Sequence, residues 1–433
     1  MSFPSALLIL QKLRDAGHTA YFAGGCVRDM LLGTEPHDID IATNALPEEV
    51  EKIFPRTVAV GAQFGVIIVL DHDAEIQVAT FRHDGTYQDG RHPTKVTFTN
   101  AEEDAKRRDF TINGLFYDPI KKEVFDYVKG REDLAKKRIC AIGNPCERFA
   151  EDKLRLLRAI RFATTLGFDI EPETWKALCD LAPEIHVVSA ERIRDELQKI
   201  FLSPHRLRGF DLLDQSGLLK VLLPEIEKLK GCEQPAEFHP EGDVFVHTRI
   251  MLQMLPEKAS LPLVLSVLFH DIGKPATRTV DEKGKMRFYA HDQVGTKMAE
   301  KILQRLRFSN EIIEAVLPAV RLHMSFKDAQ KMRLSTLRRM MARPTFEDEL
   351  ELHRVDCGSS HGMLDNYFFL QQKKEEFAQI PLIPEPLLTG KDLIALGMKP
   401  GPEFGKILQR VKDAQLENLI STPEEALALV QRK

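Results

Sequence analysis

The chain has 433 residues, 43% of them hydrophobic and 29% charged, and its formal net charge is −5. The hydrophobic fraction excludes a mainly disordered protein, and no apolar run reaches the ~18 residues of a membrane span, so we expect no membrane partner. Six widely spaced cysteines without a Cys-x-x-Cys pair indicate reduced thiols and a cytoplasmic location, while the negative charge argues weakly against a nucleic-acid partner. At about 150 residues per domain, the length predicts roughly three domains.

Helices and strands alternate in the N-terminal part of the chain. An amphipathic helix at the start precedes a strand over 19–22, a helix over 27–32 and a strand over 38–42. Pro47 occupies a first-turn position of a further helix. Strand-like runs follow at 57–60, 66–70, 76–81 and 96–99.

Beyond about residue 135 the strand pattern almost vanishes. Apolar residues recur at helical spacing over 149–166, 190–202, 206–223 and 243–370, and again in short segments of 390–433. A stretch with Pro and Gly at 224–240 predicts a domain boundary. We therefore predict an α+β protein, in which a head of strands and helices is followed by all-α domains.

Two aspartates after a Gly-Gly turn carry the first chemical signal. Residues i and i+2 of a strand face the same side, so Asp38 and Asp40 present two carboxylates side by side. These would repel each other without a cation, and they suit Mg²⁺, which leaves coordination positions for triphosphate oxygens. Two metals held in this way can activate an attacking hydroxyl and stabilise a leaving pyrophosphate. Gly24 and Gly25 leave room for a phosphate at the N-terminus of the next helix.

The run Gly-Gly-Cys-Val-Arg-Asp at 24–29, with His-Asp-Ile-Asp-Ile at 37–41, resembles the head domain of class II tRNA nucleotidyltransferases and bacterial poly(A) polymerases. Four further motifs follow in that family's order, at 81–93, 107–115, 151–155 and 191–197. The resemblance covers about residues 15–230 and implies a polymerase-β-like head with a mixed sheet, followed by a helical neck. The implied activity is template-independent addition or repair of the 3′-terminal CCA of tRNA from CTP and ATP.

The resemblance also implies roles for individual residues. Asp38 and Asp40 would be catalytic and bind two Mg²⁺ ions, and Arg28 would contact the triphosphate. Asp109 would lie near the ribose, where a carboxylate can accept a hydrogen bond from the 2′-hydroxyl. The nucleotide-binding set is Gly25, Arg28, Arg108, Asp109, Asn113, Asp152, Arg155, Arg158 and Arg161. A flexible loop linked to the switch to A addition would contain Asp84, Tyr87, Asp89 and Arg91.

The motif at 151–155 suggests how bases are selected. On one predicted helix, Asp152 and Arg155 share a face. A carboxylate accepts from the amino group that cytosine and adenine both carry, and a guanidinium donates to a ring acceptor of both bases, whereas uracil and guanine present the wrong pattern. One Asp–Arg pair could therefore select C and A without a template. The alternative is a plain ion pair between Glu151 and Arg155, worth roughly a few tenths of a kcal/mol.

Two departures from the family pattern matter for the exact activity. Gln77 stands near the position of a further acidic residue, and Glu75 shares its side of the strand, so the sequence does not assign a third metal-binding carboxylate. The run Val-Gly-Ala-Gln-Phe-Gly at 60–65 replaces a basic strand of poly(A) polymerases, which favours the tRNA-specific branch. An enzyme that adds only the A, or a poly(A) polymerase, remains an alternative because the same pocket would serve all three.

A second cluster of candidate ligands lies in the helical part. Of five His-Asp dipeptides, the one at 270–271 stands out because it ends an apolar helix and precedes Gly-Lys, as in the HD phosphohydrolase superfamily. This resemblance implies a site for one divalent ion (Mn²⁺, Ni²⁺, Mg²⁺ or Fe) formed by His247, His270, Asp271 and Asp356. His291 and His323 would add a second metal bridged by Asp271, an arrangement that suits phosphoester hydrolysis.

An HD domain is fused to one bacterial subgroup of CCA-adding enzymes, where it is linked to 2′,3′-cyclic phosphodiesterase and phosphatase activity. The resemblance therefore implies a second activity that could repair tRNA ends. An alternative of a different class is a phosphohydrolase whose head only binds RNA.

Positive charge is concentrated between Lys106 and Arg161, where 15 Lys and Arg stand against 9 Asp and Glu, and 331–339 contains a second basic run. Phosphate contacts supply most nucleic-acid affinity, so both are candidate tRNA contacts, with ordinary solvated helix surface as the alternative. The predicted domains are a nucleotidyltransferase head over 1–140, a neck that binds RNA and the nucleobase over 141–235, an HD domain over 236–370 and a helical tail over 371–433.

Overall fold

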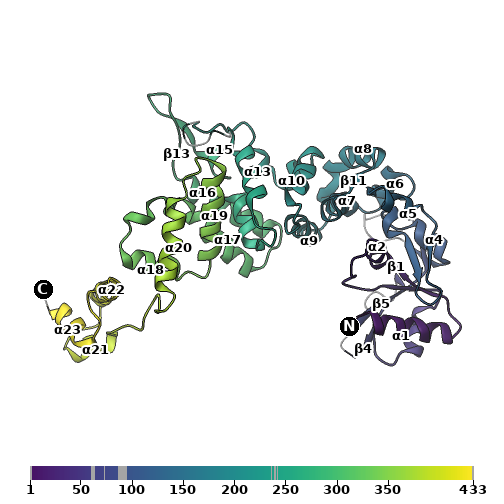
Figure 1. Cartoon of the computed structure of the whole chain (residues 1–433), viewed down its shortest axis with the longest axis horizontal. Coiled ribbons are helices and arrows are strands. Elements are labelled where there is room, and N and C mark those ends of the chain that lie inside the picture. The colour runs from purple at the N-terminus through teal and green to yellow at the C-terminus, as the bar shows by residue number, and fades with distance from the viewer. Residues whose placement is uncertain are drawn as a thin grey trace. The chain divides into compact units, whose positions relative to one another are not determined.

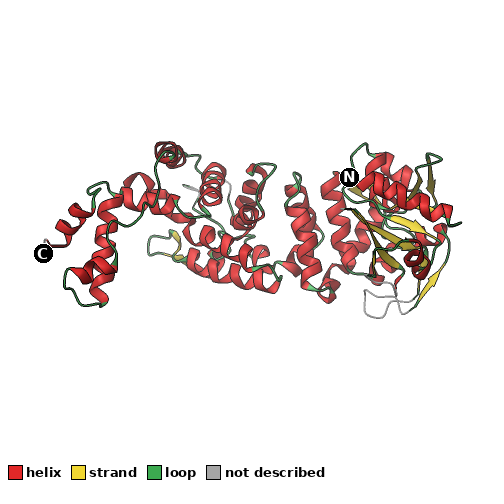
Figure 2. Cartoon of the chain, turned by 90° about the horizontal axis from the view of Figure 1, so that it is seen from below, coloured by secondary structure: helices red, strands yellow, loops and turns green. Residues whose placement is uncertain are grey.

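The computed structural model describes residues 2–59, 64–72, 74–85, 95–235, 237, 240 and 242–431. Two compact units divide the chain, Met1–Pro224 and Glu225–Lys433. The first contains the main sheet and the second is mostly helical (Figure 1). Figure 2 shows most of the strands gathered in the N-terminal part. The predicted α+β class is confirmed, whereas the domain boundaries at 140, 235 and 370 stay predictions.

A seven-stranded sheet in the order β3-β4-β5-β2-β1-β8-β9 forms the centre of the head. Its strands are β1 (Ala20–Ala23), β2 (Ile41–Thr43), β3 (Thr57–Val58), β4 (Val66–Asp71), β5 (Ala74–Thr80), β8 (Leu115–Asp118) and β9 (Glu123–Asp126). β2 pairs with β5 in parallel, and the other neighbouring pairs in this order are antiparallel. The sheet is therefore mixed, as the resemblance implied, and Phe22, Ile41 and Phe116 are fully buried within it.

The strand predicted over 38–42 begins only at Ile41, so the two aspartates precede it. The backbone carbonyl of Asp40 still accepts a hydrogen bond from the Ala23 amide at 3.0 Å. Beyond that point β1 has ended and the chain turns away into the next helix, which leaves no partner to extend the ladder. Ile39 is buried while Asp38 is exposed and Asp40 is half-buried, so the two carboxylates remain on the side opposite Ile39.

Short helices cover the head sheet, and longer helices follow it. Those of the head are α1 (Ser2–Asp15), α2 (Gly25–Leu31), α3 (Pro47–Ile53), α4 (Ala101–Lys106) and α5 (Gly130–Ala135), with the single turn η2 (Thr111–Asn113). Beyond the head lie α6 (Pro145–Glu151), α7 (Leu154–Leu166), α8 (Pro172–Leu181), α9 (Ala190–Phe201), α10 (Arg206–Gln215) and α11 (Leu218–Leu222). A separate ribbon pairs β6 (Arg82–Asp84) with β7 (Val96–Phe98).

Two of the predicted helices are each broken in the middle. The segment 149–166 divides between α6 and α7, because Asp152 adopts an extended conformation with φ −144° and ψ 105°. The Asp152 carboxylate accepts a hydrogen bond from the Leu154 amide at 3.0 Å, so it caps the start of α7. The segment 206–223 breaks at Gly217, whose φ of 81° lies in the left-handed region.

The second unit is built on the apolar helix α14 (Leu261–Phe269), which packs against α13 (Val244–Met254), α17 (Asn310–Leu322) and α19 (Phe346–Ser359). Around these lie α12 (Pro224–Glu227), α15 (Lys274–Thr277), the hairpin β12 (Arg278–Val280) and β13 (Met286–Phe288), α16 (His291–Arg305), η4 (His323–Lys331), α18 (Leu334–Met341) and α20 (Asp365–Phe377). The last helices are α21 (Gly390–Ala395), α22 (Pro402–Leu416) and α23 (Pro423–Gln431).

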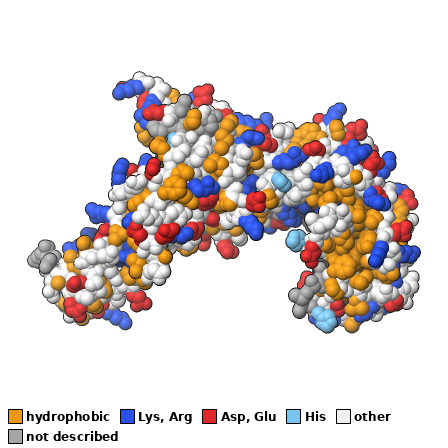
Figure 3. All heavy atoms as spheres, in the orientation of Figure 1, with side chains coloured by type: hydrophobic (Ala, Val, Ile, Leu, Met, Phe, Trp, Pro, Cys, Tyr) orange, Lys and Arg blue, Asp and Glu red, His pale blue; other side chains and the backbone are white. Residues whose placement is uncertain are grey.

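Part of the second basic run holds this last segment in place. Arg338 is buried and donates hydrogen bonds to the carbonyl oxygens of Leu416, at 3.2 Å, and Pro381, at 2.7 Å. Arg339 pairs with Asp413 of α22. These two arginines are therefore committed to packing within the unit. Over the face seen in Figure 3, positive and negative side chains are interspersed. No described helix combines the length and the apolar character needed to cross a membrane.

Candidate active sites

The aspartate pair of the head lies beside the start of α2. Gly24 has a φ of 79°, and a Cβ there would lie 2.7 Å from Nη1 of Arg108, so glycine is required for two reasons. Burial raises the pKa of Asp40, and Asp38 raises it further, against the opposing effect of Arg108. Two carboxylates that repel each other, one of them partly removed from water, form a set of hard oxygen donors that fits Mg²⁺.

A chain of hydrogen bonds connects four of the predicted nucleotide-binding residues. Arg28 Nη1 donates to Asn113 Oδ1 at 2.7 Å, and Asn113 Nδ2 donates to Asp109 Oδ1 at 3.0 Å. The other oxygen of Asp109 accepts from Arg158 Nε and Nη2, at 2.8 and 2.6 Å. Burial alone would raise the pKa of Asp109, but Arg158 and Asn113 hold it well below its usual range. The structure thus brings residues of α2, η2 and α7 into one network.

Arg108 is held by a carboxylate that sequence reasoning missed. Asp104, 1% exposed, accepts from Arg108 Nε and Nη2 at 3.2 and 3.1 Å and lies 2.6 Å from Nη2 of Arg107. Its spacing of three and four residues from the two arginines, on a helix capped by Asn100, was the available signal. One carboxylate of α4 therefore orients the two arginines that follow this helix.

The proposed base-reading motif is arranged differently from the prediction. Asp152 and Arg155 do not share one helix, because the chain breaks at Asp152, and that prediction is wrong. Asp152 instead pairs with Arg192 of α9 at 2.7 Å. Arg155 pairs with Glu151, the alternative considered from the sequence, and Nη1 of Arg155 donates to the Arg148 carbonyl at 2.8 Å. Both side chains are thus fixed in position, and their contact with a base stays a prediction.

Three of the arginines make cation–π contacts with one aromatic ring. The guanidinium carbons of Arg28, Arg158 and Arg161 lie 5.1, 5.3 and 3.8 Å from the centroid of the buried Phe162 ring. Arg161 is also paired with Glu196 of α9 at 2.6 Å. Glu196 lies in the motif at 191–197, whereas Phe162 had no sequence signal that distinguished it from an ordinary helix residue.

The remaining predicted head residues are placed as follows. Gly25 begins α2. Asp84 lies in β6, 2.9 Å from Arg82 and 3.5 Å from Arg107. Tyr87, Asp89 and Arg91 lie outside the described residues. Gln77 and Glu75 are both exposed on β5.

In the second unit, the same kind of hydrogen bond to a backbone carbonyl orients three histidine rings. The Nδ1 atoms of His270, His291 and His323 lie 2.9, 2.8 and 2.7 Å from the carbonyl oxygens of the residues three positions earlier, Val267, Phe288 and Val320. A carbonyl oxygen can only accept, so each Nδ1 donates to it, and each ring presents Nε2 to the centre of the cluster. Burial and the neighbouring His270 lower the pKa of His323 to about 4, so its ring is neutral at pH 7.

The Nε2 atoms of the three rings lie close to one another and to Asp271. Nε2 of His270 lies 3.1 Å from Asp271 Oδ2, and Nε2 of His291 lies 3.1 Å from Nε2 of His323. The two Nε2 atoms of the latter pair lie 3.5 and 3.8 Å from Asp271 Oδ1. His270 Nε2 and Asp271 Oδ1 are buried and make no hydrogen bond to any described residue. Such a set of imidazole nitrogens and a carboxylate is suited to hold a divalent cation between them.

His247 and Asp356 extend the cluster from α13 and α19. His247 Nε2 lies 3.1 Å from Asp356 Oδ1, and Ser359 Oγ lies 3.3 Å from the other ring nitrogen. His247, His270 and Asp271 form one group that could hold a metal, and Asp271, His291 and His323 form another. Asp271 belongs to both groups, as the resemblance implied for a bridging ligand.

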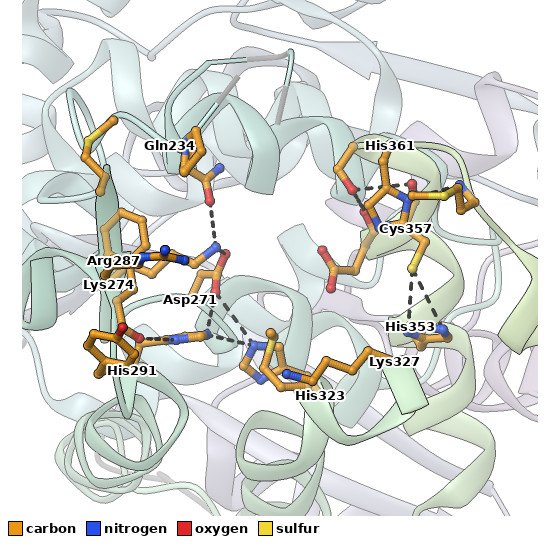
Figure 4. Close-up of a pocket in the computed structure, with 18 of the residues that line it drawn as sticks. Gln234, Asp271, Lys274, Arg287, His291, His323, Lys327, His353, Cys357 and His361 are labelled. Atoms are coloured by element: carbon orange, nitrogen blue, oxygen red, sulfur yellow. Dashed lines mark hydrogen bonds and ion pairs between the residues drawn. The ribbon is translucent and has the colours of Figure 1, made fainter. Parts of the chain in front are cut away.

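A cavity of about 600 Å³ opens beside this cluster (Figure 4). Asp271, His291, His323 and Asp356 line it together with Gln234 and Lys274. Lys285, Arg287 and Lys327 add positive charge to the lining. The cavity therefore offers space for an anionic ligand in contact with the candidate metal ligands.

Comparison with known proteins identifies the family. The model of the poly(A) polymerase head domain matches residues 20–140, that of a probable RNA- and SrmB-binding site of polymerase A matches 167–230, and that of a putative tRNA nucleotidyltransferase domain 2 matches 288–430. The fold is similar to that of the Bacillus stearothermophilus CCA-adding enzyme in complex with CTP, with a TM-score of 0.76, 26% identity and coverage of 99% of this chain and 97% of that one.

Two relatives show how far the sequence similarity extends. The CCA-adding enzyme of Streptococcus gordonii is 45% identical over 236 residues, which are 54% of this chain and 58% of that enzyme. The CCA-adding enzyme of Limosilactobacillus reuteri is 33% identical over 427 residues, which cover 94% of this chain and 91% of the relative. Because this second alignment spans nearly all of both proteins, the chain belongs to the family of CCA-adding enzymes, which are nucleotidyltransferases.

Proposed function

We propose that the first unit adds or repairs the 3′-terminal CCA of tRNA from CTP and ATP without a template. The observation that carries this proposal is the network from Arg28 through Asn113 and Asp109 to Arg158, next to the carboxylates of Asp38 and Asp40. The similar B. stearothermophilus enzyme has been solved in complex with CTP, which supports CTP as a substrate in this proposal. The proposed partners are then tRNA, CTP and ATP, and the proposed location is the cytoplasm.

In this reaction the 3′-hydroxyl oxygen of the tRNA attacks the α-phosphorus in line, and the bond from that phosphorus to the pyrophosphate breaks. Mg²⁺ ions held by Asp38 and Asp40 would activate the hydroxyl and stabilise the leaving pyrophosphate. Arg28 would donate to the triphosphate. Asp109 now accepts four hydrogen bonds, from Phe110, Asn113 and Arg158, so it would accept from the ribose in exchange for one of them. These groups act chiefly by binding and orienting the two reactants.

Incubation with three tRNA transcripts tests this function. They end at the discriminator base, after C and after CC, and each receives CTP, ATP or both. We expect completion to CCA on all three with both nucleotides. No incorporation on any of them contradicts the proposal. Growth only on the CC-ended transcript indicates an A-adding enzyme, and long A tails on unrelated RNA indicate a poly(A) polymerase.

We also infer a metal-dependent phosphohydrolase activity in the second unit, acting on 2′,3′-cyclic and monoester phosphates of RNA ends. His247, His270, Asp271 and Asp356 would hold one divalent ion, and His291 and His323 would hold another with Asp271. The buried Nε2 of His270 and Oδ1 of Asp271 favour this function, because neither has a hydrogen-bond partner among the described residues, while Lys274 pairs only with the other oxygen of Asp271. A bound ion would supply an activated water for attack on phosphorus.

His270→Ala separates the two proposed activities. We expect the variant to lose bound metal and phosphohydrolysis while it keeps nucleotide addition. His186→Ala, which changes an exposed histidine of the first unit, serves as the matched control. Metal content is measured by mass spectrometry, and the two activities by hydrolysis of bis(p-nitrophenyl) phosphate and by tRNA extension. Equal loss of both activities contradicts independent sites, and hydrolysis by the wild type with no added or bound metal contradicts the metal assignment.

A further inference from the structure

Gln234 is a buried amide in the wall of the 600 Å³ cavity, and neither proposed activity accounts for it. The residue precedes α13 and is 5% exposed. Its main-chain N–H donates to the Gly242 carbonyl at 3.3 Å, which anchors the backbone. Figure 4 shows its side chain directed toward Lys274.

The amide orientation of Gln234 follows from its partner. Lys274 Nζ lies 2.6 Å from Gln234 Oε1, and an ammonium group can only donate, so the carbonyl end of the amide must face it. The amino end, Nε2, therefore points elsewhere. This nitrogen is buried and has no hydrogen-bond partner among the residues that the structure describes. A buried donor without an acceptor is unfavourable, so the position implies an acceptor that binds there.

Lys274 also connects the Gln234 amide to the candidate metal site. The same Nζ atom that donates to Gln234 lies 2.6 Å from Asp271 Oδ2. The ammonium is 7% exposed and lies 5.7 Å from the centroid of the Phe288 ring, which further restricts it. A short chain from Asp271 through Lys274 to Gln234 thus holds an unpaired N–H at a set place beside the metal ligands.

We propose that Gln234 Nε2 donates a hydrogen bond to a non-bridging oxygen of the phosphoryl group that binds in this cavity, and that Lys274 is the positioning residue that orients it. The inference rests on the proposed phosphohydrolase function and names a substrate-contacting residue for it. A phosphoryl oxygen suits this position because it is a strong acceptor that a metal ion leaves with free lone pairs. Lys327 adds positive charge to the lining of the same cavity and favours an anionic ligand, whereas the cations of Lys285 and Arg287 are paired with carboxylates of the chain.

Substitution by glutamate tests the donor without disturbing the acceptor. In Gln234→Glu the side chain still accepts from Lys274 and keeps nearly the same shape, but Nε2 is replaced by oxygen. We expect kcat/KM for bis(p-nitrophenyl) phosphate to fall at least about tenfold, and the inhibition constant of inorganic phosphate to rise by a similar factor. Bound metal and CCA addition by the full-length protein are expected to stay unchanged. Gln234→Met, which lacks both donor and acceptor, should lose activity likewise.

Gln330→Glu, at an exposed glutamine of η4, controls for the added negative charge and should behave as the wild type. If Gln234→Glu keeps the kcat/KM and the phosphate inhibition constant of the wild type, the inference is overturned. That result would show that only the oxygen that accepts from Lys274 matters. Loss of bound metal together with activity in both variants would also overturn it, since Gln234 would then merely support the metal ligands. Absence of metal-dependent hydrolysis in the wild type would refute the phosphohydrolase function itself, and with it this inference.

Discussion

The buried charged side chains of the two candidate sites differ in the partners that the chain gives them. In the first, arginines are paired with carboxylates of the chain, as with Arg158 on Asp109 and Arg161 on Glu196. In the second, Asp271 pairs with Lys274 at 2.6 Å and also faces Nε2 of His270 at 3.1 Å, and this Nε2 has no hydrogen-bond partner among the described residues. The ion pairs of the first cluster occupy both partners, whereas the second cluster contains a ring nitrogen and a carboxylate oxygen without a hydrogen-bond partner in the described chain.

We attribute this difference to the time that each proposed ligand remains bound. A nucleotide enters and leaves in every turnover, so its site must be stable when empty, and the protein supplies counter-charges for its own arginines. A resident metal ion can bind the atoms that have no hydrogen-bond partner, and its binding then contributes to the stability of the unit around it. The contrast predicts that the two sites respond differently to mutation, chelation and acid.

The largest effect is expected from Asp40→Asn, which removes a proposed Mg²⁺ ligand of the head. Nucleotide addition should fall on the order of 10³-fold, because charge stabilisation at the reacting phosphate is lost. Extension of CC-ended tRNA measures this rate. Hydrolysis of bis(p-nitrophenyl) phosphate should be unchanged, and Asp15→Asn at an exposed aspartate should affect neither reaction. A parallel fall of both activities would show that the two sites are not separate.

Arg158→Met should be the most destabilising change in the first unit. It leaves the Asp109 carboxylate buried without its cation, at a cost of about 3 kcal/mol, the lower end of the usual range because the Arg158 side chain is 33% exposed. Urea denaturation measures the free energy of unfolding. Lys136→Met removes the cation of an exposed ion pair with Glu132 and should have little effect. Equal destabilisation by the two variants would contradict the pairing described for this network.

Metal removal should destabilise the second unit alone. Dialysis against a chelator is expected to lower the Tm of that unit, and Mn²⁺ should restore it, because an ion present at 100 times its Kd contributes about 2.7 kcal/mol. Differential scanning calorimetry with and without the ion measures the shift. His270→Ala should show no response to Mn²⁺. An unchanged Tm of the wild type after complete removal of metal would contradict a resident ion.

The smallest effect is expected from acid. The folded-state pKa of Asp109 is lowered, so its ionised form stabilises the protein above the unfolded pKa of about 3.9, and this contribution is lost as pH falls toward the folded value. Each unit of difference between the two pKa values contributes about 1.4 kcal/mol. Urea denaturation at pH 5, 4 and 3 should show a shallower loss of stability for Asp109→Asn. An identical pH dependence of variant and wild type would contradict the lowered pKa.

Local patterns predicted most elements of the fold, and their errors have physical causes. Four of the seven sheet strands, β1, β3, β4 and β5, were close to prediction, whereas β8 and β9 were not predicted. The strand at 38–42 was predicted too long because hydrogen bonds to β1 end where β1 itself ends. The helix at 149–166 was not predicted to break, because Asp152 has a second role as a cap that periodicity does not reveal.

By itself, the sequence determined the kinds of chemistry in this protein: two aspartates beside a Gly-Gly turn, a basic motif, and a set of histidines and acids in the helical half. These features lie within short segments or in a fixed order, so they can be read along the chain. The tertiary structure decided which charges meet, such as Asp109 with Arg158 across 49 positions and His247 with Asp356 across 109. Only the packing of helices sets such contacts, and only their geometry shows which buried atoms, from His270 Nε2 to Gln234 Nε2, have no partner within the described chain.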